Sequence, residues 1–173
     1  NTGRTAPLFF VSPGQINFQI PPGTATGAGT VSVVRNGNLI ASTSVTIATV
    51  EPSLFTANAS GTGTPAAVLY RVRNGILTTE SVSPQIDLGP EGDVTVLVLY
   101  GTGIRKRSSL SAVTIKIGGV NVGADFAGEA PGFMGLDQIN TAVLPRSLAG
   151  KGMVNLELTV DGKTANVVTL NFK

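Results

Sequence analysis

The chain contains no cysteine, no histidine and no tryptophan among its 173 residues. These absences exclude disulfide bonds, thiolate or imidazole zinc sites, cysteine nucleophiles and every catalytic triad that depends on histidine. Carboxylates, lysines and hydroxyls are the only catalytic groups left, and the ten acidic residues are scattered along the chain. The composition therefore predicts a protein that is not an enzyme and that uses no cofactor.

Charge is scarce as well, and its two signs nearly balance. Charged residues make up 13% of the chain, about half the share of an average soluble domain, and the formal net charge is +2. A small positive balance of this kind gives no reason to expect a nucleic-acid partner. The longest apolar run is far shorter than the roughly 20 residues of a membrane-spanning helix, so no membrane span is predicted.

The chain is rich in β-branched residues and poor in residues that favour helices. Valine, threonine and isoleucine supply 50 residues, whereas glutamate, lysine and glutamine supply 14. Because β-branched residues fit a pleated, half-buried surface, the sequence predicts an all-β protein. Two-residue hairpin turns are predicted at Asn36-Gly37, Asn74-Gly75 and Asp161-Gly162. Alternating runs predict strands at 15–20, 30–35, 42–50, 66–73, 93–100, 113–117, 138–143, 154–160 and 166–172.

A repeat with a spacing near 123 residues runs through the chain. Gln15, Ile16 and Asn17 recur as Gln138, Ile139 and Asn140, and each motif is followed by glycines, alternating apolar residues and one of the predicted turns. Upstream, Ala6-Pro7 and Phe10 match Ala130-Pro131 and Phe133. Two copies of one β-module explain this pattern most economically.

The two copies differ in what precedes them. Predicted strands and an apolar run over 120–126 lead into the second copy, whereas five residues precede the first Ala-Pro pair. We therefore expect a partial first module at 1–52, a connector with a hairpin at 53–90 and a second module at 91–173. An open half-sandwich has to be completed by upstream chain, by the other module or by another molecule.

Five segments together carry a family resemblance: 11–21, 51–57, 99–103, 131–140 and 160–170. In this order they resemble the uncharacterised C-terminal domain at the ends of many large secreted proteins of Solibacter-type soil bacteria, over nearly the whole chain. Residues 97–103 and 114–119 are also similar to the IPT/TIG type of immunoglobulin-like module. The resemblance implies two immunoglobulin-like β-sandwich modules, the first incomplete at its N-terminal side, in a secreted protein, and it supplies no catalytic residues.

Two sets of polar residues are candidate binding sites. Asp87, Glu91 and Asp93 form the densest acidic group and are candidate calcium ligands, but their spacing matches no known calcium loop, so a charged loop beside a strand is favoured. In the two Gln-Ile-Asn motifs, alternation points the isoleucine inward, and the amides are expected to satisfy backbone groups. These motifs are accordingly interpreted as structural.

Basic and aromatic residues give a second pair of candidates. Arg105, Lys106 and Arg107 form the only basic cluster, and a solvated loop is favoured over binding of phosphate or an acidic polymer. Tyr70 and Tyr100 lie in apolar runs, where packing is favoured over stacking on a sugar.

The sequence thus predicts a non-catalytic, extracellular immunoglobulin-like module that serves as a stalk, spacer, adhesion or assembly element. One alternative is a subunit of an extracellular polymer whose first module accepts a strand from a neighbour. The other is a carbohydrate-binding module of a secreted protein, which makes polysaccharide a candidate partner.

Overall fold

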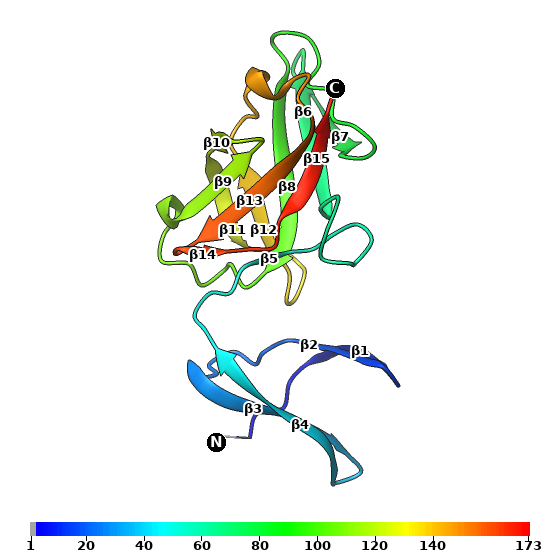
Figure 1. Ribbon diagram of the computed structural model, residues 1–173, viewed down its shortest axis with the longest axis vertical. Coiled ribbons are helices and arrows are strands. Elements are labelled where there is room, and N and C mark those ends of the chain that lie inside the picture. The colour runs from blue at the N-terminus through cyan, green and yellow to red at the C-terminus, as the bar shows by residue number, and fades with distance from the viewer. Residues whose placement is uncertain (1–2) are drawn as a thin grey trace. The chain divides into compact units, whose positions relative to one another are not determined.

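The computed structural model describes residues 3–173, and antiparallel strands form nearly all of its regular structure (Figure 1). Helical structure in this part of the chain is limited to two 3-10 turns, Leu110–Ala112 and Arg146–Leu148. The chain divides after Thr49 into an N-terminal unit and a C-terminal unit that begins at Val50. The prediction of an all-β fold is confirmed.

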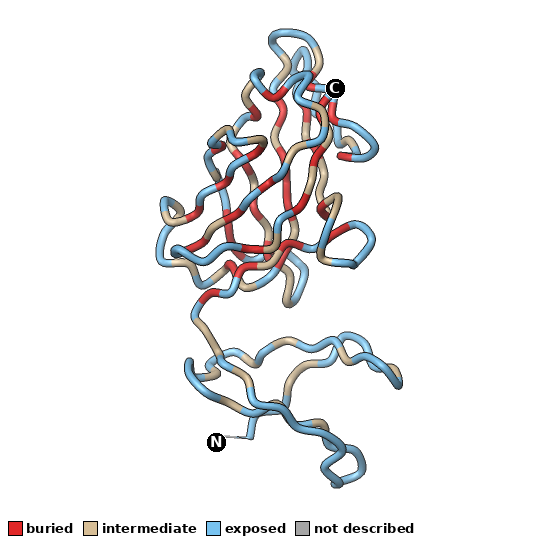
Figure 2. The backbone as a smooth tube through the Cα atoms, viewed as in Figure 1, coloured by how far each residue is buried: buried red, intermediate tan, exposed pale blue. Residues whose placement is uncertain are grey.

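The N-terminal unit consists of two antiparallel ribbons. One pairs β1 (Leu8–Ser12) with β2 (Gln15–Phe18), and the other pairs β3 (Gly27–Arg35) with β4 (Asn38–Ile47). None of the described residues up to Thr49 is buried, and Figure 2 shows this unit only in the colours of exposed and intermediate residues. Residues 3–49 therefore form no buried core of their own.

The C-terminal unit is a β-sandwich of two sheets. The first sheet contains β9 (Val113–Ile117), β10 (Val120–Val122), β13 (Gly152–Val160), β14 (Lys163–Thr164) and β15 (Val168–Phe172). The second contains β5 (Ser53–Leu54), β6 (Ala67–Arg73), β7 (Ile76–Ser81), β8 (Val94–Thr102), β11 (Ala124–Glu129) and β12 (Asp137–Thr141).

The core of this unit is supplied by alternate residues of both sheets. Leu97 and Leu99 of β8 and Leu156 and Leu158 of β13 are fully buried members of a single apolar cluster. Successive side chains of a strand point to opposite faces, so the two-residue spacing places these leucines on the inner faces. Burying one such side chain stabilises the fold by roughly 1.5–3 kcal/mol.

The sequence analysis predicted a connector at residues 53–90, but these residues are part of the C-terminal unit. The β6–β7 hairpin joins the second sheet because β6 pairs with β8, and the following loop buries Val82, Ile86 and Leu88 in the core. The Ile86 N–H donates to the Asn171 carbonyl at 2.7 Å. The sandwich thus begins at Val50, because this segment contributes both strands and core side chains.

The three predicted hairpin turns are confirmed. Asn36-Gly37, Asn74-Gly75 and Asp161-Gly162 each have two successive residues with φ between 49° and 78°, as a type I′ turn requires. They connect β3 to β4, β6 to β7 and β13 to β14.

Candidate functional site

The two Gln-Ile-Asn motifs have the same local geometry. The Gln15 side-chain amide donates to the Asn17 side-chain oxygen at 2.7 Å, and Gln138 donates to Asn140 at the same distance. The amides thus bond to each other, whereas the sequence analysis expected them to satisfy backbone groups. The isoleucines differ in burial, since Ile139 is fully buried and Ile16 only half-buried.

The strands around the two motifs are not the same. In the C-terminal unit, β12 pairs with β11 on one side and β8 on the other, and β13 pairs with β9 as well as with β14 and β15. Within residues 3–173, β2 pairs only with β1, and β3 pairs only with β4. Residues 3–49 therefore contain no counterparts of β8 and β9, and one edge of β2 and one edge of β3 have no partner strand within the described part of this unit.

The inward side chains of the first copy are correspondingly exposed. When the β3–β4 and β13–β14 hairpins are matched at their turns, Val31 and Val33 correspond to Leu156 and Leu158. Both leucines are fully buried, whereas both valines are half-buried. In the same way, Val45 and Ile47 of β4 are half-buried and correspond to the buried Leu170 and Phe172 of β15. The face that forms the core of the second copy thus lies open in the first.

The upstream part of the predicted repeat is not structurally equivalent in the two copies. Phe10 of β1 pairs with Asn17, and the residue that pairs with Asn140 is Phe126 of β11, whereas Phe133 lies in an exposed loop. The reason is loop length: a two-residue turn joins β1 to β2, whereas residues 130–136 join β11 to β12. β1 therefore covers the edge of β2 that corresponds to the edge of β12 covered by β11.

Two of the three acidic candidates for calcium binding, Asp87 and Asp93, form ion pairs with basic side chains. The Asp93 carboxylate accepts hydrogen bonds from Arg71 at 2.8 Å and from Arg73 at 2.6 Å. Asp87 pairs with Lys173 at 3.1 Å and accepts the Gly89 N–H, while Glu91 is exposed. No group of three acidic side chains with metal-binding geometry occurs in the described part of the chain.

Arg71 is the centre of this ion network. It is 5% exposed, and its guanidinium also forms a two-pronged contact with Glu80, with N–O distances of 2.6 and 3.0 Å. Its Nη2 atom further donates to the Asp87 carbonyl. The hydrogen bond from Arg73, together with that from Arg71, lowers the pKa of Asp93 to about 2. The network therefore joins the loop after β7 to β6 and the start of β8.

The first residue of the predicted basic cluster is fixed by a buried carboxylate. Asp137, 1% exposed, accepts the backbone N–H groups of Ile104 and Arg105 at 2.7 and 3.1 Å and the Arg105 Nε–H at 2.6 Å. Arg105 also pairs with Glu129 at 2.8 Å. Sequence reasoning missed Asp137, although it directly precedes the second Gln-Ile-Asn motif.

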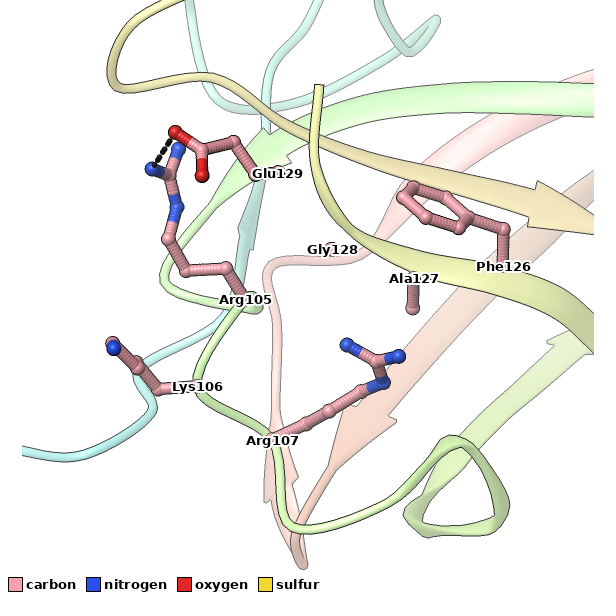
Figure 3. Close-up of a pocket in the computed structure, with 7 residues that line it drawn as sticks. All are labelled: Arg105, Lys106, Arg107, Phe126, Ala127, Gly128 and Glu129. Carbon is pink, nitrogen blue, oxygen red and sulfur yellow. Dashed lines mark hydrogen bonds and ion pairs between the residues drawn. The ribbon is translucent and has the colours of Figure 1, made fainter. Parts of the chain in front are cut away.

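All three residues of the basic cluster border a hollow of about 360 Å³ (Figure 3). Its walls are Arg105, Lys106 and Arg107 on one side and the β11 residues Phe126, Ala127, Gly128 and Glu129 on the other. The Arg107 side chain extends toward β11 in this view, and its Nε atom is buried without a hydrogen-bond partner among the described residues. Tyr70 and Tyr100 are half-buried on β6 and β8.

Comparison of the chain with protein-family models, with curated proteins and with solved structures finds no match. None of the helices in residues 3–173 is long and apolar enough to cross a membrane.

Proposed function

We propose that the chain is a non-catalytic, extracellular structural module whose N-terminal unit is an assembly element. In this proposal, two β-strands from another segment, either upstream chain or a neighbouring subunit, pair with β2 and β3 and complete a second sandwich. The observation that carries the proposal is the comparison of the two copies: β8 and β9 occupy, on β12 and β13, the edges that are unpaired on β2 and β3.

The chemistry of the missing strands follows from the second copy. β8 presents Leu97 and Leu99 to the core and β9 presents Ile115 and Ile117, all of them buried. A completing pair of strands therefore carries apolar residues at every second position, and their backbone groups satisfy the unpaired edges. Seating such strands covers the half-buried face that includes Ile16, Val31 and Val33.

A pair of lysine substitutions on β3 tests this proposal. Val31→Lys places a charge at the position that corresponds to the buried Leu156, whereas Ser32→Lys places the same charge on the opposite, exposed face. An uncompensated buried charge costs roughly 3–5 kcal/mol, which weakens association by a factor of about a hundred or more. We expect Val31→Lys to prevent the added strands from pairing with β2 and β3, and Ser32→Lys to leave this pairing intact.

The readout is hydrogen exchange of the β2 and β3 amides, measured together with the mass in solution at increasing protein concentration. If a neighbouring subunit completes the unit, protection of these amides rises with concentration along with the mass. If upstream chain does so, joining a second copy of residues 91–122, which contains β8 and β9 but not β11, ahead of Ala6 protects the same amides in a monomer. Either result supports the proposal, provided that Val31→Lys removes the protection. Cooperative unfolding of the N-terminal unit by itself, with β2 and β3 fully protected in a dilute monomer, would contradict it.

A further inference from the structure

We propose that the hollow between the 103–109 loop and β11 binds an acidic polysaccharide. In this proposal, Arg107 holds a sugar carboxylate and the ring of Phe126 packs against the sugar; Figure 3 shows both side chains at the hollow. This site lies wholly in the C-terminal unit, so it stands independently of how the N-terminal unit is completed.

The anionic part of the ligand is indicated by Arg107. Within the described residues this guanidinium forms no ion pair, and its buried Nε–H has no acceptor. A buried cationic donor without a partner is costly, and a small shift of the side chain that lets a ligand oxygen reach this donor removes that cost. A carboxylate matches a guanidinium with two parallel hydrogen bonds. Lys106 adds a second exposed positive charge, whereas Arg105 is already neutralised by Asp137 and Glu129.

The space for the ligand depends on Gly128. Its φ is not in the left-handed region, so the backbone does not require glycine at this position. A Cβ built there would lie 3.3 Å from the Phe126 ring and 3.5 Å from Nη1 of Arg107. The absence of a side chain at this residue therefore keeps the space between the ring and the guanidinium open.

The sugar part of the ligand is indicated by the face next to the hollow. Gly128 of β11 lies opposite Gln138 of β12, which lies opposite Tyr100 of β8. Two residues further along β12, Asn140 lies opposite Phe126 of β11. Residues directly opposite one another on paired strands share a face of the sheet. Aromatic rings and amides thus lie side by side over three strands, a width of about 10 Å at the usual strand spacing. This combination suits the apolar faces and hydroxyl groups of a sugar chain.

A nucleic acid fits the same surface less well. A phosphate backbone is held by a succession of cations along its track, whereas among the described residues that line this hollow only Lys106 and Arg107 lack an acidic partner. The Glu129 carboxylate, 65% exposed at the rim, also repels closely spaced phosphates. A chain whose carboxylates are separated by whole sugar rings avoids this repulsion.

The test is a titration of the full chain with galacturonic acid oligomers, followed by nitrogen-15 NMR at the Arg107 Nε–H and the Gly128 amide. Neutral galactose oligomers of the same length provide the ligand control. We expect both signals to shift with the acidic oligomer, and Arg107→Gln to weaken binding by at least about tenfold, or roughly 1.4 kcal/mol. Lys116→Gln removes the same charge from an exposed site on β9 and is expected to change the affinity little.

Two further variants keep the proposal falsifiable if Arg107→Gln perturbs the loop. Arg107→Lys retains the positive charge but lacks the planar guanidinium, so we expect it to bind the acidic oligomer with intermediate affinity. Gly128→Val is expected to fill the hollow and to abolish binding. Equal binding of neutral and acidic oligomers would overturn the proposal. So would an Arg107→Gln protein that binds like the wild type, or tighter binding of single-stranded DNA than of the acidic oligomer at equal ionic strength.

Discussion

Replacing Asp137 by asparagine tests how strongly one buried carboxylate holds the loop of the basic hollow. The carboxylate accepts three hydrogen bonds, two from the backbone N–H groups of Ile104 and Arg105 and one from the Arg105 side chain. An asparagine has one acceptor oxygen, so if that oxygen keeps the two backbone donors, its NH₂ group faces the Arg105 Nε–H. The substitution thus replaces a hydrogen bond between charged groups by two opposed donors.

The magnitude follows from burial. A hydrogen bond to a charged group contributes roughly 1.5–3 kcal/mol, and removing one partner of a buried ion pair costs roughly 3–5 kcal/mol. Arg105 keeps its contacts to Glu129 and to the Leu136 carbonyl, so the lower end applies. We expect the free energy of unfolding to fall by about 3 kcal/mol, as measured by urea denaturation followed by far-ultraviolet circular dichroism.

Glu129→Gln is the matched control, because it makes the same isosteric change at the other carboxylate of the same arginine. The Glu129 side chain is 65% exposed, against 1% for Asp137. An exposed ion pair contributes at most about 1 kcal/mol, so the control is expected to lose less than that. Equal losses in the two variants, or a loss below about 1 kcal/mol for Asp137→Asn, would refute the assignment of the loop's stability to the buried carboxylate.

Two further predictions concern other parts of the C-terminal unit. The pKa of Asp93 is about 2 in the folded protein and about 3.9 in an unfolded chain, so its stabilising effect is present above about pH 4 and is lost as the pH falls toward 2. Thermal melts between pH 5 and pH 2 should therefore show a smaller decrease in melting temperature for Asp93→Asn than for the wild type, and equal slopes would contradict this. Gly103→Ala should cost more than about 2 kcal/mol, because its φ is +74° and a Cβ would collide with the Glu51 carbonyl oxygen. Gly119→Ala, with a similar φ of +80° but open space around it, should cost only about 1 kcal/mol in the same denaturation experiment.

The features that were predictable from sequence are those fixed by neighbouring residues. The turn at Asn36-Gly37 and its two counterparts form as expected, because two adjacent residues that tolerate positive φ determine each turn. The amide contact within each Gln-Ile-Asn motif is equally local and occurs in both copies, but the sequence analysis predicted bonds from these amides to backbone groups instead.

The features that were missed depend on residues far apart in the chain. Alternation marked residues 66–73 as a strand but contained no information that this strand pairs with β8, so residues 53–90 were taken for a connector. Asp137 meets donors that lie 32 and 33 residues earlier, and the unpartnered Arg107 is distinguished from Arg105 only by the position of Asp137 and Glu129. The sequence thus identified the basic cluster but not which of its arginines is available to a ligand.

The energetics of the open face bear on which source of strands completes the N-terminal unit. Five inward side chains are half-buried: Ile16, Val31, Val33, Val45 and Ile47. Full burial of such a side chain contributes roughly 1.5–3 kcal/mol, so covering the exposed halves contributes about 1 kcal/mol each, or about 5 kcal/mol together. Association of a freely diffusing partner costs about 4–15 kcal/mol, so this gain offsets the cost only at the lowest end of that range. A tethered segment or an array of linked subunits avoids most of that cost through its high effective concentration, and we therefore expect completion in a dilute solution of single chains to be weak.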